Sequence, residues 1–138
     1  MNSVFADTFY WAALTDVRDP ANSRALTISR SLAPDTIVTT DEVLAEYLTF
    51  FAGARTSIRD LAGRNVAALL NSLEVRVFPQ SRETFLAGLQ LYRARPDKGY
   101  SLVDCISMQT MRREGLTAVL TNDKHFEQEG FHALLRDP

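Results

Sequence analysis

Short apolar segments alternate with longer segments of helical character along the whole chain, and this alternation limits the possible folds more than any other feature. Short apolar strands joined by helices are typical of βα units around a mostly parallel sheet. We therefore expect an α/β fold with four or five strands. The expected strands span residues 3–6, 36–39, 74–78, 117–121 and, at an edge, 131–135; the expected helices span 8–14, 20–32, 41–51, 56–73, 81–95, 102–114 and 123–129.

Residues that favour helix ends set several of these boundaries. Thr40 and Ser101 are expected to cap the helices that follow them, because a side-chain hydroxyl accepts a hydrogen bond from a free N–H of the first turn. Gly115 is expected to end the helix over 102–114. Asp19 followed by Pro20 predicts a further helix start, with proline at the first helical position.

Bulk properties narrow the class of protein. The 138 residues fit one domain over 1–138, and the 46% hydrophobic and 23% charged content excludes a disordered chain. The net charge of −2 argues against a partner held by bulk electrostatics alone. Cys105 is the single cysteine, so no intrachain disulfide can form, and no apolar run is long enough to span a membrane. We expect a cytoplasmic protein.

Carboxylates follow the expected strands at the points where function gathers in parallel sheets. Asp7 comes directly after the first strand, Glu46 lies in the helix after the second, and Asp123 follows the fourth. Asp104 lies near the start of the helix over 102–114, which is apolar on nearly every side. Because the carboxyl ends of parallel strands share one edge of a sheet, these side chains are candidates for one site.

A structural explanation competes for three of the four. Asp7, Asp104 and Asp123 lie at expected helix starts, where carboxylates are favoured as caps. Glu46 lies in mid-helix, on the margin of the apolar arc, where capping does not explain it. Glu42 lies farther toward solvent and is the weaker candidate.

Carboxylates gathered at one edge repel each other unless a cation neutralises them. Oxygen ligands without a cysteine cluster or paired histidines favour Mg²⁺, with Mn²⁺ as a plausible substitute, over zinc. A hard divalent ion in an acidic cleft suits phosphodiester hydrolysis.

Four stretches together resemble the PIN-domain family, in particular the VapC-type toxins of bacterial toxin–antitoxin pairs. The matching stretches are Val4-Phe5-Ala6-Asp7-Thr8, Thr39-Thr40-Asp41-Glu42-Val43-Leu44-Ala45-Glu46, Tyr100-Ser101-Leu102-Val103-Asp104-Cys105 and Leu120-Thr121-Asn122-Asp123-Lys124-His125-Phe126, with Gly130-Phe131 behind them. The resemblance implies a three-layer α/β/α sandwich and an Mg²⁺-dependent endoribonuclease with a small antitoxin partner. It assigns catalysis and metal binding to Asp7, Glu46, Asp104 and Asp123.

Two positions depart from the family pattern: Phe9 replaces a frequent small polar residue, and Asn122 replaces a frequent aromatic or apolar one. Neither removes a carboxylate. Phe9 also argues against a haloacid-dehalogenase-like phosphatase, which needs an acid there. Phe78-Pro79 after the third strand argues against a phospho-receiver domain. An RNA-processing PIN nuclease without a toxin role, or a catalytically silent interaction domain, remain alternatives.

Other residues carry weaker hypotheses. His125 is a less favoured proton donor, and Trp11 is either core or a base-stacking ring. Self-association into a homodimer is expected, with the antitoxin bound across exposed members of an aromatic set, or else the set fills the core. The aromatic set is Phe9, Tyr10, Trp11, Tyr47, Phe50 and Phe51.

Overall fold

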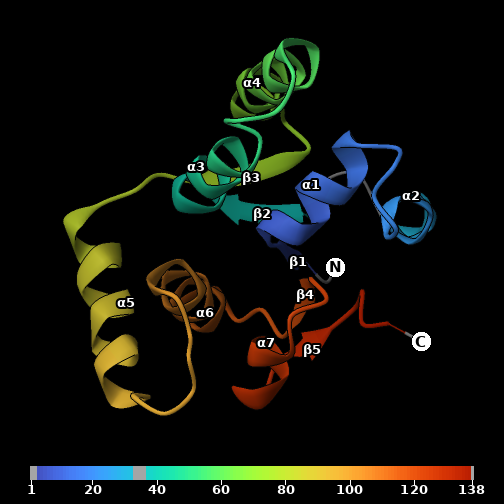
Figure 1. Ribbon diagram of the computed structural model, residues 1–138. Coiled ribbons are helices and arrows are strands. Elements are labelled where there is room, and N and C mark those ends of the chain that lie inside the picture. Colours follow the sequence, from blue (N-terminus) through green and yellow to red (C-terminus); the bar gives the residue numbers. More distant parts are fainter. Residues whose placement is uncertain (1–2, 33–36, 138) are drawn as a thin grey trace.

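The structure, a computed structural model, describes residues 3–32 and 37–137. Its centre is a five-stranded sheet in the order β3-β2-β1-β4-β5, with every neighbouring pair parallel (Figure 1). The strands are β1 (Val4–Ala6), β2 (Ile37–Thr40), β3 (Val75–Phe78), β4 (Ala118–Leu120) and β5 (His132–Ala133). The predicted α/β fold with a parallel sheet is confirmed.

Helices surround this sheet and connect its strands. They are α1 (Thr8–Thr15), α2 (Asn22–Ser31), α3 (Asp41–Phe50), α4 (Thr56–Leu70), α5 (Arg82–Ala94), α6 (Leu102–Glu114) and α7 (Lys124–Gln128). By their contacts, α1 packs with α2, α3 and α4, whereas α5 packs along α6, and α6 also contacts α3 and α7. In Figure 1, α5 and α6 lie beside each other at the lower left.

Local capping explains where the helices around the site begin. Thr40 accepts a hydrogen bond from the Val43 N–H at 3.1 Å, as predicted. Ser101 and Asp104 form a reciprocal capping box at the start of α6, and Gly115 ends that helix in the left-handed region with φ of 70°. The caps at Thr40 and Ser101 thus set where α3 and α6 begin, at the carboxyl edge of the sheet. Gly115 sets where α6 ends.

One predicted helix start is wrong. The helix expected from Pro20 begins instead at Asn22, and Asp19 does not cap it. The Asp19 carboxylate accepts a hydrogen bond from the Ala21 N–H at 2.8 Å, which holds Asp19 and Pro20 in a turn before the helix. The second strand was expected from Thr36, which lies outside the described residues, and the edge strand β5 is shorter than expected.

The core fills both sides of the central strands. Phe5 and Leu120, on adjacent strands, are fully buried, as are Tyr47 on α3 and Phe126 on α7. Cys105 is buried as a small apolar side chain. At the contact of α5 with α6, a Cβ on Gly88 would lie 2.3 Å from Cγ1 of Ile106, so the helices approach closely only because this position is glycine. Among the described residues, no helix is both long and apolar enough to cross a membrane.

Candidate metal centre

Asp7 lies where β1 passes into α1, and its side chain points into protein. Only 6% of the residue is exposed. Oδ2 accepts a hydrogen bond from the Thr121 hydroxyl at 3.0 Å, whereas buried Oδ1 has no hydrogen-bond partner within residues 3–32 and 37–137. Asp7 occupies the N-cap position of α1, but its side chain forms no cap hydrogen bond. Capping therefore does not account for this carboxylate.

Burial, followed by the neighbouring charge of Asp104 and the weaker effect of Glu46, raises the pKa of Asp7 to about 7. Hydrogen bonds from the Thr8 backbone and the Thr121 side chain act in the opposite direction. An unpartnered buried carboxylate oxygen is costly unless it is protonated or meets a cation. The local environment thus favours a proton or a metal ion at Asp7.

Glu46 approaches this group from α3. The Thr8 hydroxyl, one residue beyond Asp7, donates a hydrogen bond to Oε1 of Glu46. The residue is half-buried, as its position on the margin of the apolar arc predicted. Glu42 accepts a hydrogen bond from Thr84 of α5 at 3.3 Å instead, so it has a separate structural partner.

Asp104 is buried at the first turn of α6, with 9% exposed. Its Oδ2 accepts from the Ser101 N–H at 3.1 Å, so the predicted capping role is real. Burial nevertheless raises its pKa; the Ser101 backbone hydrogen bond lowers it, and the charges of Asp123 and Glu46 add to the increase. Asp104 therefore both caps its helix and takes part in the crowding of negative charge.

Asp123 caps α7 and is joined to the same region through Thr121. Its Oδ1 accepts from the His125 N–H at 2.9 Å, and its own N–H donates to the Thr121 hydroxyl at 3.1 Å. His125 Nδ1 lies 3.3 Å from Oδ1 of Asp123 and 3.7 Å from Oδ2 of Asp104. One ligand atom from each of Asp104, Asp123 and His125 lies within 4.8 Å of the others.

The four sequence candidates thus act on one another. Asp7 responds to Asp104 and Glu46, and Asp104 responds to Asp123 and Glu46. The donors are mostly carboxylate oxygens, which suit Mg²⁺ or Mn²⁺, and the unpartnered oxygen of Asp7 provides a place for a cation. The residues present therefore fit a divalent metal.

Sequence reasoning missed the two threonines that hold the acids. Thr8 orients Glu46, and buried Thr121 binds both Asp7 and the backbone of Asp123. Each threonine adjoins a strand end that carries an acid, and this position is the signal that could have identified them.

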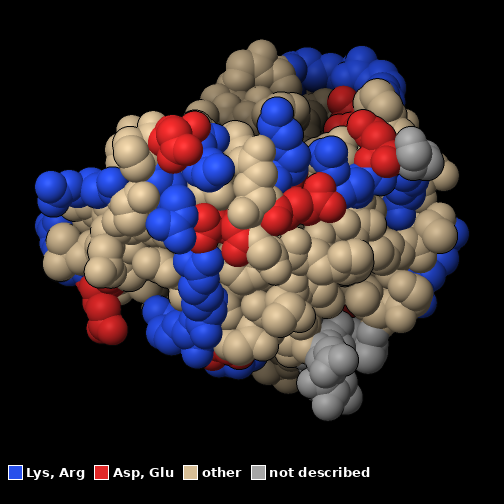
Figure 2. Space-filling model, turned by 90° about the horizontal axis from the view of Figure 1, so that it is seen from below, with Lys and Arg blue, Asp and Glu red and all other residues tan. Residues whose placement is uncertain are grey.

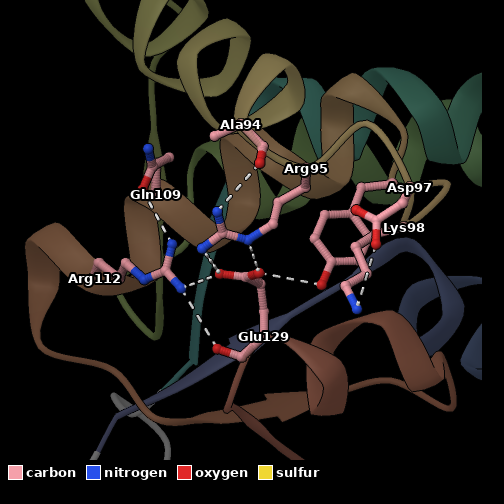
Figure 3. A network of polar contacts seen from close by, with 8 residues as sticks. Ala94, Arg95, Asp97, Lys98, Gln109, Arg112 and Glu129 are labelled. Carbon is pink, nitrogen blue, oxygen red and sulfur yellow. Dashed lines mark hydrogen bonds and ion pairs between the residues drawn. The ribbon is translucent and has the colours of Figure 1, made fainter.

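A network of ion pairs around Glu129 lies next to this centre (Figure 3). Glu129, whose side chain is 5% exposed, accepts hydrogen bonds from Arg95 at 2.7 Å, from Arg112, and from the Tyr100 hydroxyl at 3.2 Å. Burial alone would raise the pKa of Glu129, but the guanidinium groups of Arg112 and Arg95 hold it below its usual range. The Tyr100 ring packs on His125 with ring centroids 5.3 Å apart. The network thus joins α7 to the segment that precedes α6.

Basic and acidic side chains are mixed on the face shown in Figure 2, where small patches of Asp and Glu (red) lie among Lys and Arg side chains (blue). The net charge of −2 agrees with this distribution. A polyanion approaching this face meets local basic groups and no extended basic surface, as the charge balance predicted.

The aromatic set is mostly core. Tyr10, Trp11, Tyr47 and Phe51 are at most 8% exposed, and Phe50, at 64%, is the exposed member. Of the two interpretations of Trp11, packing in the core is confirmed: the residue is buried, and its Nε1 donates to Thr39 at 3.4 Å. Edges of Trp11 and Tyr47 line a groove of about 360 Å³ between α1, α3 and α4. His132 is exposed, as expected.

Known proteins share this sequence pattern and fold. The family profile described as PIN domain matches residues 4–131. The chain is 28% identical over 131 residues to the 23S rRNA-specific endonuclease VapC20 of Mycobacterium tuberculosis, across 93% of this chain and 95% of that protein.

Three solved structures support the comparison. The M. tuberculosis VapC20 crystal structure, described as a Sarcin-Ricin loop cleaving toxin, has a TM-score of 0.83 at 28% identity, covering 94% of this chain and 96% of that one. FitAcB from Neisseria gonorrhoeae scores 0.66 at 17% identity, with 94% and 95% covered. VapBC-5 of M. tuberculosis, a member of the VapBC family of toxin-antitoxin systems, scores 0.59 at 19%, with 99% and 100% covered. The last two support the fold alone.

Proposed function

The chain belongs to the PIN-domain family, and we propose that it is a metal-dependent endoribonuclease that hydrolyses RNA phosphodiester bonds. The observation that carries this proposal is the buried Asp7 carboxylate, with one unpartnered oxygen, among the charges of Asp104 and Glu46. Such a group is stable in its ionised form only with a cation beside it. A catalytically silent interaction domain does not need a buried carboxylate with an unpartnered oxygen, which destabilises the fold.

Asp7, Glu46, Asp104 and Asp123 would hold the metal, which we propose to be Mg²⁺, with Mn²⁺ as a substitute. A divalent ion bound there supplies charge neutralisation for the scissile phosphate, a more acidic water as nucleophile, and stabilisation of the leaving oxygen. The protein's own contribution is to place the oxygens before the ion arrives. Thr121 holds Oδ2 of Asp7 and leaves Oδ1 without a hydrogen-bond partner among the described residues, while Thr8 orients Glu46.

The biological role that we propose is that of the toxin in a toxin–antitoxin pair, with ribosomal RNA as the substrate class. Support comes from the likeness to VapC20, which covers nearly the whole length of both chains. An RNA-processing nuclease without an antitoxin is the alternative.

For the antitoxin we propose a helix that docks in the groove between α1, α3 and α4. The groove is lined mainly by apolar groups, and its polar groups come from Thr15, Tyr47, Asn65 and Ser72. An amphipathic helix is the kind of partner that buries its apolar face in such a groove. The earlier expectation of docking across the aromatic set is thus narrowed to the edges of Trp11 and Tyr47, since most of the set is core.

Self-association remains part of the proposal. Phe85, Leu86 and Tyr92 of α5, the helix that packs against α6 at Gly88, are 41%, 53% and 50% exposed, respectively. Apolar side chains exposed along one helix are typical of a contact with a second copy. Light scattering of the purified protein tests for the homodimer.

Cleavage of purified tRNA, rRNA and mRNA with Mg²⁺ and with a chelator tests the nuclease. Metal-dependent cleavage of rRNA is expected, and no cleavage of any RNA would contradict the proposal. Co-expression with a short adjacent reading frame, where the genome has one, tests the toxin role. Growth arrest that is relieved by the partner supports it, whereas cleavage without toxicity supports RNA processing.

A further inference from the structure

His125 offers a nitrogen donor to a centre that is otherwise made of oxygens. Its Nδ1 lies 3.3 Å from Oδ1 of Asp123 and 3.7 Å from Oδ2 of Asp104. The nitrogen is shielded from solvent and has no hydrogen-bond partner among the described residues. A buried ring nitrogen between two carboxylates, without a hydrogen bond of acceptable geometry, is short of a partner.

The separations suit ligands of a single ion. Two donors about 2.1 Å from the same metal can lie at most about 4.2 Å apart. Both distances from Nδ1 fall below this limit, and one ligand atom of each of the three residues lies within 4.8 Å of the others. A shift of a fraction of an ångström would bring all three onto one ion.

A second observation points to a cation here independently of this triad. Asp7 is 94% buried, and its Oδ1 has no partner in the described part of the chain, while the charge of Asp104 raises the pKa of this carboxyl. The 94% is the complement of its 6% exposure. An unpartnered buried carboxylate oxygen of this kind needs a proton or a cation.

The imidazole ring is also held in place from behind. Tyr100 packs against it at 60° with centroids 5.3 Å apart, and the Tyr100 hydroxyl is fixed by Glu129. Arg95 and Arg112 in turn fix Glu129 (Figure 3). Ligands that are oriented before the metal arrives bind it more tightly, because less side-chain freedom is lost.

From these contacts we infer that Nδ1 of His125, together with Asp104 and Asp123, ligates a divalent first-row transition ion, with Mn²⁺ as its probe, in preference to Mg²⁺. The inference rests on the proposed nuclease function and changes its preferred ion from Mg²⁺ to a transition ion such as Mn²⁺. Imidazole suits transition ions, whereas Mg²⁺ prefers oxygen ligands and retains its waters. The competing arrangement is a histidine that only pairs with the two acids and does not touch the ion.

The test measures metal binding directly. The test variant is His125→Phe, which keeps a ring but removes the nitrogen. The chain has two histidines, so His132→Gln, at the exposed position of β5, serves as the control. Mn²⁺ binding is followed by the electron paramagnetic resonance of the free ion, with Mg²⁺ as competitor. Pulsed measurements on bound Mn²⁺ detect the coupling of a directly bound ¹⁴N.

Wild type is expected to bind Mn²⁺ at least ~10-fold more tightly than Mg²⁺, and to show the ¹⁴N coupling. His125→Phe is expected to weaken Mn²⁺ binding ~10-fold or more, to change Mg²⁺ binding far less, and to lose the coupling. His132→Gln should match wild type in all three respects. Absence of the coupling in wild type, or its persistence in His125→Phe, would overturn the inference.

Folding of the variant does not limit the test. If His125→Phe fails to fold, wild-type protein labelled with ¹⁵N-histidine serves instead, and the bound-nitrogen signal must change from the ¹⁴N to the ¹⁵N pattern. An unchanged spectrum would overturn the inference. Failure of the nuclease proposal looks different: RNA cleavage that survives Asp7→Asn would remove that proposal whatever the spectra show.

Discussion

The hydroxyl of Thr121 donates a 3.0 Å hydrogen bond to Oδ2 of Asp7, across 114 positions of the sequence. The same hydroxyl oxygen accepts the N–H of Asp123 at 3.1 Å. One fully buried side chain thus ties the end of β4 to the end of β1 and sets two of the carboxylates. The positions of Asp7 and Asp123 relative to each other are thus set by a side chain that need not itself touch the proposed metal.

Thr121→Val tests this positioning role. Valine keeps the shape, but it removes the bond to Asp7 and leaves a buried N–H of Asp123 unsatisfied, so a loss of about 1.5–3 kcal/mol in the free energy of unfolding is expected. Cleavage should fall by about 10-fold or more, with weaker metal binding, because Asp7 is no longer oriented. Thr117→Val, at an exposed position before the same strand, is the control and should change neither. Wild-type metal affinity in Thr121→Val would contradict the role.

The raised pKa of Asp7 predicts how stability of the metal-free protein varies with pH. The folded-state pKa of about 7 lies above the ordinary 3.8, so the folded state holds this proton more strongly than the unfolded state does. The stabilisation is complete below about pH 4 and is lost as pH rises through 7, by roughly 4 kcal/mol at 1.4 kcal/mol per pKa unit.

Denaturant unfolding of wild type and Asp7→Asn in a chelator measures this effect. Relative to wild type, Asp7→Asn should gain stability between pH 4 and pH 8, because asparagine carries no proton to lose. Adding Mg²⁺ or Mn²⁺ at pH 8 should stabilise wild type and not the variant. A difference between the two proteins that stays constant with pH would show that Asp7 is not perturbed.

Two glycines in helices should respond to alanine with opposite signs. Gly88→Ala places a Cβ 2.3 Å from Ile106 Cγ1 and 3.1 Å from the Ile106 backbone N, so α5 must move from α6, at a cost of about 1–3 kcal/mol. Gly63→Ala on α4 meets no atom within 4 Å and should add roughly 0.5–1 kcal/mol, because alanine favours helix. Thermal melting distinguishes the two, and equal shifts would contradict the close approach of the helices.

Local signals predicted the elements around the site well. Thr40, Ser101 and Gly115 each act through the nearest turn of backbone, and all three play the roles that were expected. Asp19 misled because its carboxylate can bond to a backbone N–H two residues on in a turn as readily as it can cap a helix. Only the local backbone conformation distinguishes the two arrangements.

Long-range relationships explain what the sequence could not predict about the centre. The carboxyl-edge rule brought Asp7, Glu46 and Asp123 together as candidates, the apolar surroundings of its helix added Asp104, and their metal role stays a prediction. The threonine contacts depend on strand order, since β4 pairs with β1 at the centre of the sheet. Core packing of Trp11 was one of two predicted interpretations, and the packing of α1 against α3 and α4 decides between them.

The most direct measurement compares the rate of ribosomal RNA cleavage by wild type, Asp7→Asn, Asp104→Asn and Asp60→Asn in Mg²⁺ and in a chelator. Asp60 is an exposed acid of α4, paired with Arg64, and serves as the control for lost charge. Wild type and Asp60→Asn should cleave at similar rates with metal only, while Asp7→Asn and Asp104→Asn fall at least ~100-fold, or about 2.7 kcal/mol in the barrier. Undiminished cleavage by the folded Asp7 and Asp104 variants would contradict a nuclease centred on these carboxylates.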